Sequence, residues 1–81
     1  MEATEFKSRE ILETTAATDA LTAREKHLIG LAVTITRGCS YCTGGRTQKA
    51  LAAGIPQESL TAATDLVAAV NAGVAVRTVL L

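Results

Sequence analysis

Two cysteines separated by two residues, Cys39 and Cys42, are the only thiols in this chain of 81 residues. In the C-x-x-C spacing the two sulfurs lie one helical turn apart, so they can join as a disulfide with little movement of the backbone. A helix that begins at these cysteines offers unpaired N–H groups and the positive end of its dipole, and both favour a thiolate. The spacing therefore predicts a redox-active pair.

Two other roles stay open for the cysteines: inert, buried thiols, or metal ligands. Zinc usually has four protein ligands in a structural site. One chain offers only Cys39, Cys42 and His27, so a zinc ion would need a site shared across a subunit axis. We therefore expect no metal ion and no other cofactor.

Three residues near the pair have candidate roles in its chemistry. Arg46 lies four residues after Cys42 on the same helix face, where its charge would favour the thiolate or hold an anionic substrate. His27 is the only imidazole, a group that exchanges protons near neutral pH. Tyr41 lies between the cysteines and is a candidate for substrate contact. Each also has a structural interpretation: a salt bridge of Arg46 with Glu25 or with an acidic residue of a neighbour, a packed or surface His27, and a Tyr41 that only covers the disulfide.

A predicted hairpin of two helices positions the cysteines. Thr22 and Glu25 match a capping box, in which the Thr hydroxyl and the Glu carboxylate each accept a backbone N–H, and an apolar run follows at once. A tight turn at residues 37–38 leads into a second helix over residues 40–53. That helix is predicted to stop at Gly54, because glycine suits the left-handed position after a helix.

The register of this hairpin determines which side chains meet. If the two helices are antiparallel, position 42 lies opposite position 34, and Arg46 lies opposite Gly30. A glycine inside a helix costs about 1 kcal/mol relative to alanine, and we expect close approach of the neighbouring helix to compensate. His27, Arg46 and the cysteine pair then lie along one seam, an arrangement that suits a proton relay or a thiolate-stabilising site.

Three further helices complete the expected fold. The first covers Glu5 to Thr15, and a later one begins at or just after Pro56. A kink or a break at residues 71–73 precedes a last short helix over Val74 to Leu80. The sequence has no internal repeat and no linker. It predicts an all-α protein with a single domain over residues 1–81.

The composition points to an assembly. Hydrophobic residues make up 48% of the chain and charged residues 20%, with one Phe, one Tyr and no Trp. A monomer of this size has too little interior to bury so much aliphatic surface, so we expect an obligate homo-oligomer. The net charge is zero and there is no basic run, which argues against a nucleic-acid partner.

The sequence also predicts a cytoplasmic protein. We expect no segment to reach the roughly 18 apolar residues that span a bilayer, and hence no membrane partner. The start MEATEFKSRE lacks the basic and apolar regions of a signal peptide. In the cytoplasm a lone C-x-x-C is more often catalytic or metal-binding than a permanent structural disulfide.

The run REKHLIGLAVTITRGCSYC, followed by KALAAGIPQESLTAAT, resembles the core of the AhpD-like, or carboxymuconolactone decarboxylase-like, superfamily over about residues 20–80. The resemblance implies an AhpD-like helical bundle around a central antiparallel hairpin, assembled as homotrimers or homohexamers. It also implies alkyl hydroperoxidase and disulfide-reductase chemistry at the cysteine pair, or lactone decarboxylation in branches that lack the pair. Because both cysteines are present, the thiol branch is favoured.

This sequence departs from the redox branch at two positions. That branch typically reads E-x11-C-x-x-C-x3-H, in which the carboxylate and the imidazole relay a proton to the thiol. His27 stands at the Glu position and Arg46 at the His position. Arginine stays protonated and cannot pass a proton on, so Arg46 would act through its charge, and His27 would supply the titrating group.

We therefore predict a thiol-dependent (alkyl hydro)peroxidase or a disulfide oxidoreductase, acting on a small-molecule peroxide or on a thiol/disulfide partner protein. Cys42 shares the face of Arg46, which makes it the predicted attacking thiol and Cys39 the resolving one. Two alternatives stay open. The substituted relay positions favour a non-catalytic oligomeric module, and the family resemblance alone favours a lactone decarboxylase.

Overall fold

Helices make up most of the protein. The computed structural model describes residues 1–80, and within that range there is no β-strand. The elements, in chain order, are one 3-10 turn and four α-helices: η1 (Ala3–Glu5), α1 (Lys7–Ala16), α2 (Ala23–Thr36), α3 (Ser40–Ala52) and α4 (Gln57–Val79). The predicted all-α class is confirmed.

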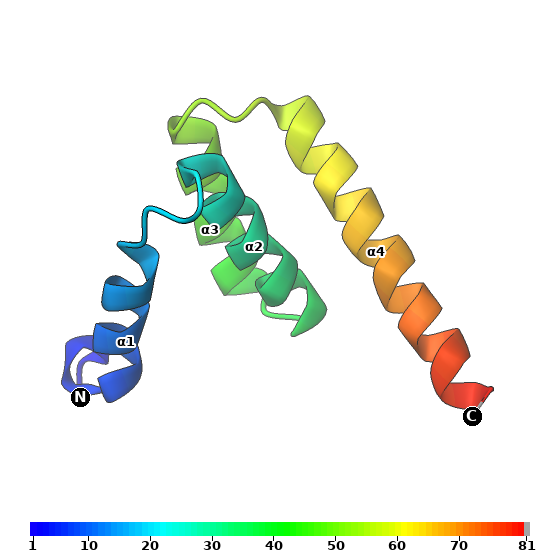
Figure 1. The fold of residues 1–81 in the computed structure, drawn as a ribbon, viewed down its shortest axis with the longest axis horizontal. Helices are drawn as coiled ribbons and strands as arrows, with labels where there is room; N and C mark the ends of the chain where they lie inside the picture. The colour runs from blue at the N-terminus through cyan, green and yellow to red at the C-terminus, as the bar shows by residue number, and fades with distance from the viewer. Residues whose placement is uncertain (81) are drawn as a thin grey trace.

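Helices α2 and α3 form the central antiparallel hairpin (Figure 1). Two contacts define its register: the Thr43 hydroxyl donates to Thr34 Oγ1 at 3.0 Å, and the Arg46 guanidinium covers Gly30. Positions 30 and 46 thus face each other as predicted. Position 42 was expected opposite position 34, but Thr43 takes that place and Cys42 is exposed. A small core joins this hairpin to α4, with Leu31 only 3% exposed; its other members are Ala50, Ile55 and Leu60, and Leu28 and Ile35 pack against it.

The turn between α2 and α3 is a Schellman motif. Gly38 has a φ of 73°, its N–H donates to the Ile35 carbonyl at 3.0 Å, and the Cys39 N–H donates to the Thr34 carbonyl at 3.1 Å. A positive φ of this size is strained for a residue with a Cβ, so glycine is required. Gly54, with a φ of 92°, ends α3 in the same way. The predicted turn at residues 37–38 and the predicted stop at Gly54 are both confirmed.

The start of α2 is the predicted capping box. The Thr22 hydroxyl accepts the Glu25 N–H at 3.1 Å, and the Glu25 carboxylate accepts the Thr22 N–H at 2.7 Å. These bonds satisfy two of the unpaired N–H groups at the helix start. The bond from the Thr22 N–H, with a smaller effect of the Thr22 hydroxyl, holds the pKa of the Glu25 carboxyl below its ordinary value.

Helix α4 returns alongside α2 and runs parallel to it. Near its start, the Arg24 guanidinium of α2 donates to Ser59 Oγ at 3.2 Å. Further along, the Asn71 amide donates to Thr36 Oγ1 at 3.0 Å. Both contacts join residues 35 positions apart, which is the pattern of two helices that run in the same direction.

The predicted break at residues 71–73 is wrong, because α4 is one continuous helix over Gln57–Val79. The Asn71 amide donates to the Val67 carbonyl at 3.0 Å as well as to Thr36. Its side chain therefore bonds within its own helix and to α2, and does not end the helix. Gly73 costs the helix only about 1 kcal/mol relative to alanine. The expected short last helix is the final part of α4.

The continuity of α4 overturns a second expectation. As a helix of 23 residues it has the length and apolar composition of a membrane span, which no segment was expected to reach. Very little of it is buried within the chain. A subunit interface produces the same pattern of exposed apolar surface, and the charged residues Asp65 and Arg77 lie within the helix.

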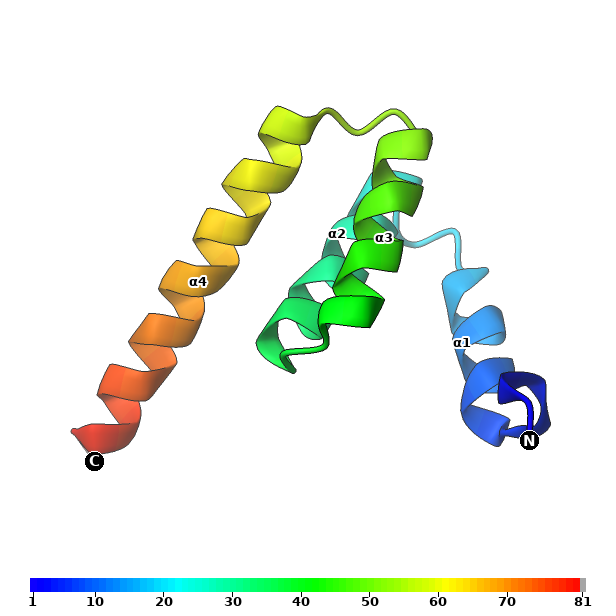
Figure 2. The same cartoon turned by 180° about the vertical axis from the view of Figure 1, so that it is seen from behind.

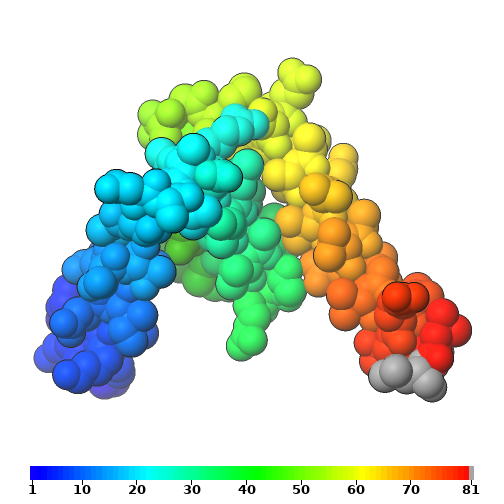
Figure 3. Space-filling view, viewed as in Figure 1, coloured from blue at the N-terminus to red at the C-terminus, as the bar shows by residue number. Residues whose placement is uncertain are grey.

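Helix α1 stands apart from the hairpin. Its one substantial contact is with η1, and all of its residues are exposed. Phe6 is extended at the N-cap position, so the helix predicted from Glu5 begins at Lys7 instead. The view from behind and the space-filling view show α1 and α4 on opposite sides of the central hairpin (Figures 2 and 3).

This open shape exposes more surface than a chain of this mass normally does. The solvent-accessible area is 6495 Å², against about 4,600 Å² for a typical monomer of the same mass. The radius of gyration of 14.6 Å exceeds the roughly 12 Å of a compact chain of this length. Large exposed apolar side chains lie on all four α-helices, among them Ile11, Leu12, Ile29, Val33, Leu51, Leu66, Val70 and Val74.

Candidate functional site at the start of α3

Cys39 and Cys42 are joined by a disulfide at the start of α3, with their Cα atoms 5.3 Å apart. Cys39 belongs to both helices of the hairpin. Its N–H closes the Schellman motif of α2, and as the N-cap of α3 its Sγ accepts the Cys42 N–H at 3.2 Å. The turn therefore delivers this sulfur to the unpaired N–H groups of α3, a position that stabilises a thiolate after reduction.

The two cysteines differ in exposure. Cys42 is exposed, whereas Cys39 is partly buried. Thiol–disulfide exchange begins with attack on one sulfur and expels the other as a thiolate. An incoming thiolate reaches Cys42 more readily. Cys39 is the better leaving group, because the Cys42 N–H and the helix dipole stabilise its charge.

The surface beside the disulfide is open. Tyr41 is 93% exposed between the two cysteines, so its ring faces solvent. At Gly44 and Gly45 no atom lies within 4 Å of the place that a Cβ would take. The backbone of α3 is therefore accessible next to the disulfide, which suits contact with the sulfur of another molecule.

Arg46 occupies the seam between α2 and α3. Its guanidinium lies so close to Gly30 that a Cβ at position 30 would stand 2.5 Å from Cζ and 2.9 Å from Nε. This is the close approach that the glycine predicted. The alternative salt bridge with Glu25 is not formed within residues 1–80, and that carboxylate accepts the N–H of Thr22. Within residues 1–80 the one ion pair joins Arg9 to Glu13, so Arg46 has no carboxylate partner there.

His27 lies on α2 one turn before Gly30 and is partly buried. Because Thr34 faces Thr43 and Gly30 faces Arg46, His27 is further from the disulfide than Arg46 is. The rise along α2 from Thr34 to His27 is about 10 Å. Arg46 thus stands between the imidazole and the cysteines along the seam, and the role of His27 as a titrating group stays a prediction.

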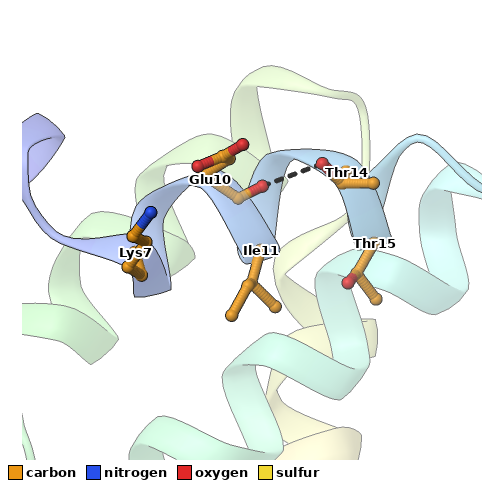
Figure 4. A pocket seen from close by; sticks show the side chains of 5 residues that line it. All are labelled: Lys7, Glu10, Ile11, Thr14 and Thr15. Carbon is orange, nitrogen blue, oxygen red and sulfur yellow. Dashed lines mark hydrogen bonds between the residues drawn. The ribbon is translucent and has the colours of Figure 1, made fainter.

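Hollows in the surface lie away from the disulfide. One is formed by α1 alone, where the Thr14 hydroxyl donates to the Glu10 carbonyl (Figure 4); it is lined by Lys7, Glu10, Ile11, Thr14 and Thr15. Another lies between α2 and α4 and is lined by Ala32, Thr36, Leu66, Val67, Val70 and Asn71. Neither contains a cysteine or Arg46.

The residues of the site do not form a metal centre. In the part of the chain that the structure describes, residues 1–80, no three His, Cys, Asp or Glu side chains gather as a metal ion would require. The two sulfurs are bonded to each other and are not available as ligands. That the protein uses no metal or cofactor stays a prediction.

A sequence profile of the carboxymuconolactone decarboxylase family matches residues 7–81, nearly the whole chain. The chain belongs to this family. No curated protein and no solved structure matches it. The match includes all four α-helices and the cysteine pair, so the resemblance to the AhpD-like, or carboxymuconolactone decarboxylase-like, superfamily is confirmed. In this family member the pair is present as a disulfide at a helix start.

Two features near the disulfide were not predicted from the sequence. The turn at Arg37 was predicted, but the charge that Arg37 brings, two residues before Cys39, was given no role. A charge count by segment would have found it, because residues 26–57 contain no Asp or Glu. The hydroxyl pair of Thr34 and Thr43 joins the helices close to the turn. Nothing in the sequence marks that pair before the register of the hairpin is known.

Proposed function

We propose that this protein is a thiol–disulfide oxidoreductase whose Cys39–Cys42 pair alternates between a disulfide and a dithiol. The observation that carries the proposal is the position of the disulfide at an exposed helix start, with one accessible sulfur and one N-capping sulfur. The pair joins residues only three positions apart, in a turn that backbone hydrogen bonds already close. Such a disulfide stabilises the fold less than a long-range one would, which supports a chemical use.

The reductive half of the cycle follows from the greater exposure of Cys42 relative to Cys39. A partner thiolate attacks Cys42 Sγ, a partner–Cys42 disulfide forms, and the Cys39–Cys42 bond breaks, so Cys39 leaves with the electron pair as a thiolate. A second partner thiolate then attacks the partner sulfur and releases the oxidised partner and the Cys42 thiolate. In the reverse direction Cys42 attacks a partner disulfide and Cys39 resolves the mixed disulfide. The exposure thus supports Cys42 as the attacking thiol.

A small-molecule peroxide is the alternative oxidant for the same pair. The Cys42 thiolate would attack one peroxide oxygen, releasing an alcohol after protonation and leaving a sulfenic acid. The Cys39 thiolate would then form the disulfide with loss of water. We place this reaction second because the leaving oxygen needs a proton. Arg46 cannot donate one at neutral pH, and His27 lies beyond Arg46 in the seam.

The proposal is tested by substituting each of the two cysteines in turn. The full chain is reduced and then treated with an aromatic disulfide, and adducts are followed by mass spectrometry of the intact protein. Cys39→Ser should accumulate a stable mixed disulfide at Cys42, because the resolving thiol is missing. Cys42→Ser should react at least about ten-fold more slowly, because its remaining thiol is partly buried.

Three other results would favour the alternatives. A disulfide that resists reduction until the protein unfolds would support the non-catalytic module. Peroxide consumption by the reduced protein, lost in both single variants, would make peroxide the physiological oxidant. Decarboxylation of a small lactone that survives Cys39→Ser combined with Cys42→Ser would support the lactone decarboxylase.

We also propose that the chain works as a cytoplasmic homotrimer or homohexamer with neither a membrane nor a nucleic acid as its partner. Its excess exposed area, on the order of 1,900 Å², is more than the about 800 Å² that each partner contributes to a standard interface. Leu66, Val70 and Val74 form an exposed apolar stripe at four-residue spacing on α4. A subunit interface would cover this stripe, and cytoplasmic reductants keep such a pair cycling.

A further inference from the structure

Acidic residues are absent from the segment that forms the redox site. The chain has eight basic and eight acidic residues. Residues 26–57, which include most of α2 and all of α3, contain no Asp or Glu, yet they contain Lys26, Arg37, Arg46 and Lys49. A protein with no net charge therefore has its disulfide in an electropositive segment.

Two of these cations flank the disulfide in the sequence. Arg37 is the C-cap of α2, two residues before Cys39, and it is exposed. Arg46 lies one helical turn after Cys42 and is held in the seam against Gly30. Within residues 1–80 the one ion pair lies on α1, so neither cation is neutralised there.

Acidic residues of the other elements do not face the disulfide. Glu25 lies in the first turn of α2 and Glu58 in the first turn of α4, both at the end of the hairpin away from its turn. On α4, Ala63 and Val67 are partly buried toward α2. Asp65 lies two residues from each of them, so it is on the opposite face. The acidic residues of η1 and α1 belong to elements with no substantial contact with the hairpin. Asp19 lies in the loop before α2, at the same end of the hairpin as Glu25.

We propose that the exchange partner of this disulfide carries carboxylates beside its reacting sulfur. The inference rests on the proposed function and names the substrate class of the same site. Unneutralised cations in the seam and at the turn raise the local concentration of anions and favour the approach of an anionic thiolate to Cys42. The recognised chemistry is an acidic thiol or disulfide, whether the carboxylates belong to a small molecule or to a polypeptide.

The test is the charge dependence of disulfide reduction in the full chain. The oxidised protein is reduced with mercaptosuccinate, which has two carboxylates, with neutral 2-mercaptoethanol and with cationic cysteamine. Each rate is corrected for the fraction of the reductant that is thiolate at the pH of the assay and for the basicity of that thiolate. At about 10 mM salt we expect mercaptosuccinate to react about ten-fold faster than 2-mercaptoethanol, and cysteamine to react more slowly. The advantage should largely disappear at about 1 M salt, where the Debye length is about 3 Å.

Substitutions of Arg37 and Arg46 test whether their charges cause the faster reaction of mercaptosuccinate. Arg37→Gln and Arg46→Gln should each reduce the advantage of mercaptosuccinate about three-fold. Arg46→Lys should retain most of it, because the charge is kept. Arg77→Gln, in the last turn of α4, is the matched control and should leave every rate unchanged. Thermal unfolding of each variant shows that the protein remains folded.

A second arm distinguishes the two sources of carboxylates. Two short peptides are compared as reductants, one with a central cysteine flanked by Glu and one flanked by Gln. If the acidic peptide reacts faster than mercaptosuccinate and loses rate in Tyr41→Ala, the partner is a polypeptide that contacts the exposed ring. If mercaptosuccinate is faster and Tyr41→Ala changes neither rate, the partner is a small thiol. Either result supports an acidic partner.

Two results would overturn the inference. Equal corrected rates for mercaptosuccinate and 2-mercaptoethanol at low salt would remove the charge preference, and so would an advantage that survives Arg37→Gln combined with Arg46→Gln. Both leave the proposed function intact, because the neutral thiol still reduces the disulfide. If no thiol reduces the folded protein, the proposed function fails, and the inference fails with it.

Discussion

Arg46, a long cationic side chain of α3, rests on Gly30, the smallest residue of α2. It stands where the redox pattern of the superfamily has histidine. A guanidinium cannot relay a proton, but one that is held in a seam keeps a permanent positive charge one helical turn from Cys42. The substitution is therefore expected to exchange proton transfer for electrostatic attraction, which agrees with an acidic partner.

Gly30→Ala tests whether the position of Arg46 matters. A Cβ at position 30 would stand 2.5 Å from Cζ of Arg46, so the guanidinium must move away. Alanine also favours the helix by about 1 kcal/mol, so thermal stability should not fall, while the preference for mercaptosuccinate should decrease as in Arg46→Gln. Gly73→Ala is the control: nothing lies within 4 Å of its Cβ position, and it should only stabilise the protein. An unchanged preference in Gly30→Ala would contradict this role.

The carboxyl of Glu25 is expected to make the free energy of unfolding depend on pH in the acid range. The N–H and hydroxyl of Thr22 hold the pKa of its carboxyl below the ordinary value. A carboxyl with a lower pKa in the folded state stabilises the protein above its unfolded pKa, and this contribution is lost as the pH falls through the folded pKa. The free energy of unfolding should therefore decrease between about pH 5 and pH 3, and less steeply in Glu25→Gln.

Urea unfolding between about pH 5 and pH 3 measures how far the pH dependence of the free energy of unfolding differs between the wild type and Glu25→Gln. Glu58→Gln, in the first turn of α4, is the control, because α4 has no side-chain capping bond at its start. If Glu25→Gln and Glu58→Gln changed the pH dependence equally, the capping box would not be its cause.

At the scale of elements, the turn and the redox site are one structure. Cys39 completes the C-terminal motif of α2 and begins α3. The orientation of its sulfur therefore depends on Gly38, whose φ is 73°. A change in this turn is expected to move the sulfur relative to the N–H groups of α3.

Gly38→Ala and Gly54→Ala form a matched pair. Both glycines have a positive φ, so each substitution should destabilise the protein by about 1–2 kcal/mol. Only Gly38→Ala should also change the reduction rate of the disulfide, because Gly54 ends α3 at its other end. Denaturant unfolding and the reduction rate by 2-mercaptoethanol are measured for both variants. Equal reduction rates would show that the turn does not position Cys39.

The helix boundaries near the site were predictable because their signals are local. The capping box of Thr22 and Glu25 and the stops at Gly38 and Gly54 each depend on a few neighbouring residues. The continuity of α4 was not predictable, because Asn71 bonds to Thr36, 35 positions away. In the sequence alone, Asn and Gly so close together are typical of a break.

At the scale of the whole molecule, the exposed stripe of α4 predicts the assembly. Leu66→Asp or Val70→Asp should convert a trimer or hexamer to smaller species, because a charge would be buried at the interface. Light scattering coupled to size-exclusion chromatography gives the mass. Ala68→Asp is the control, because position 68 shares a face with Asp65, where the chain already has a charge. A wild-type protein that is monomeric at high concentration would contradict the assembly.

The disulfide between Cys39 and Cys42 encloses a ring of very few residues. A cross-link stabilises a protein mainly by limiting the conformations of the denatured chain, and the effect grows with the loop. It is about 2 kcal/mol for so small a ring, against about 4.7 kcal/mol for a loop of 100 residues. Opening the ring therefore removes less than half of the stability that a long-range disulfide would supply. The protein should keep its fold through repeated turnover, and the reduced form should melt about 10 °C below the oxidised form.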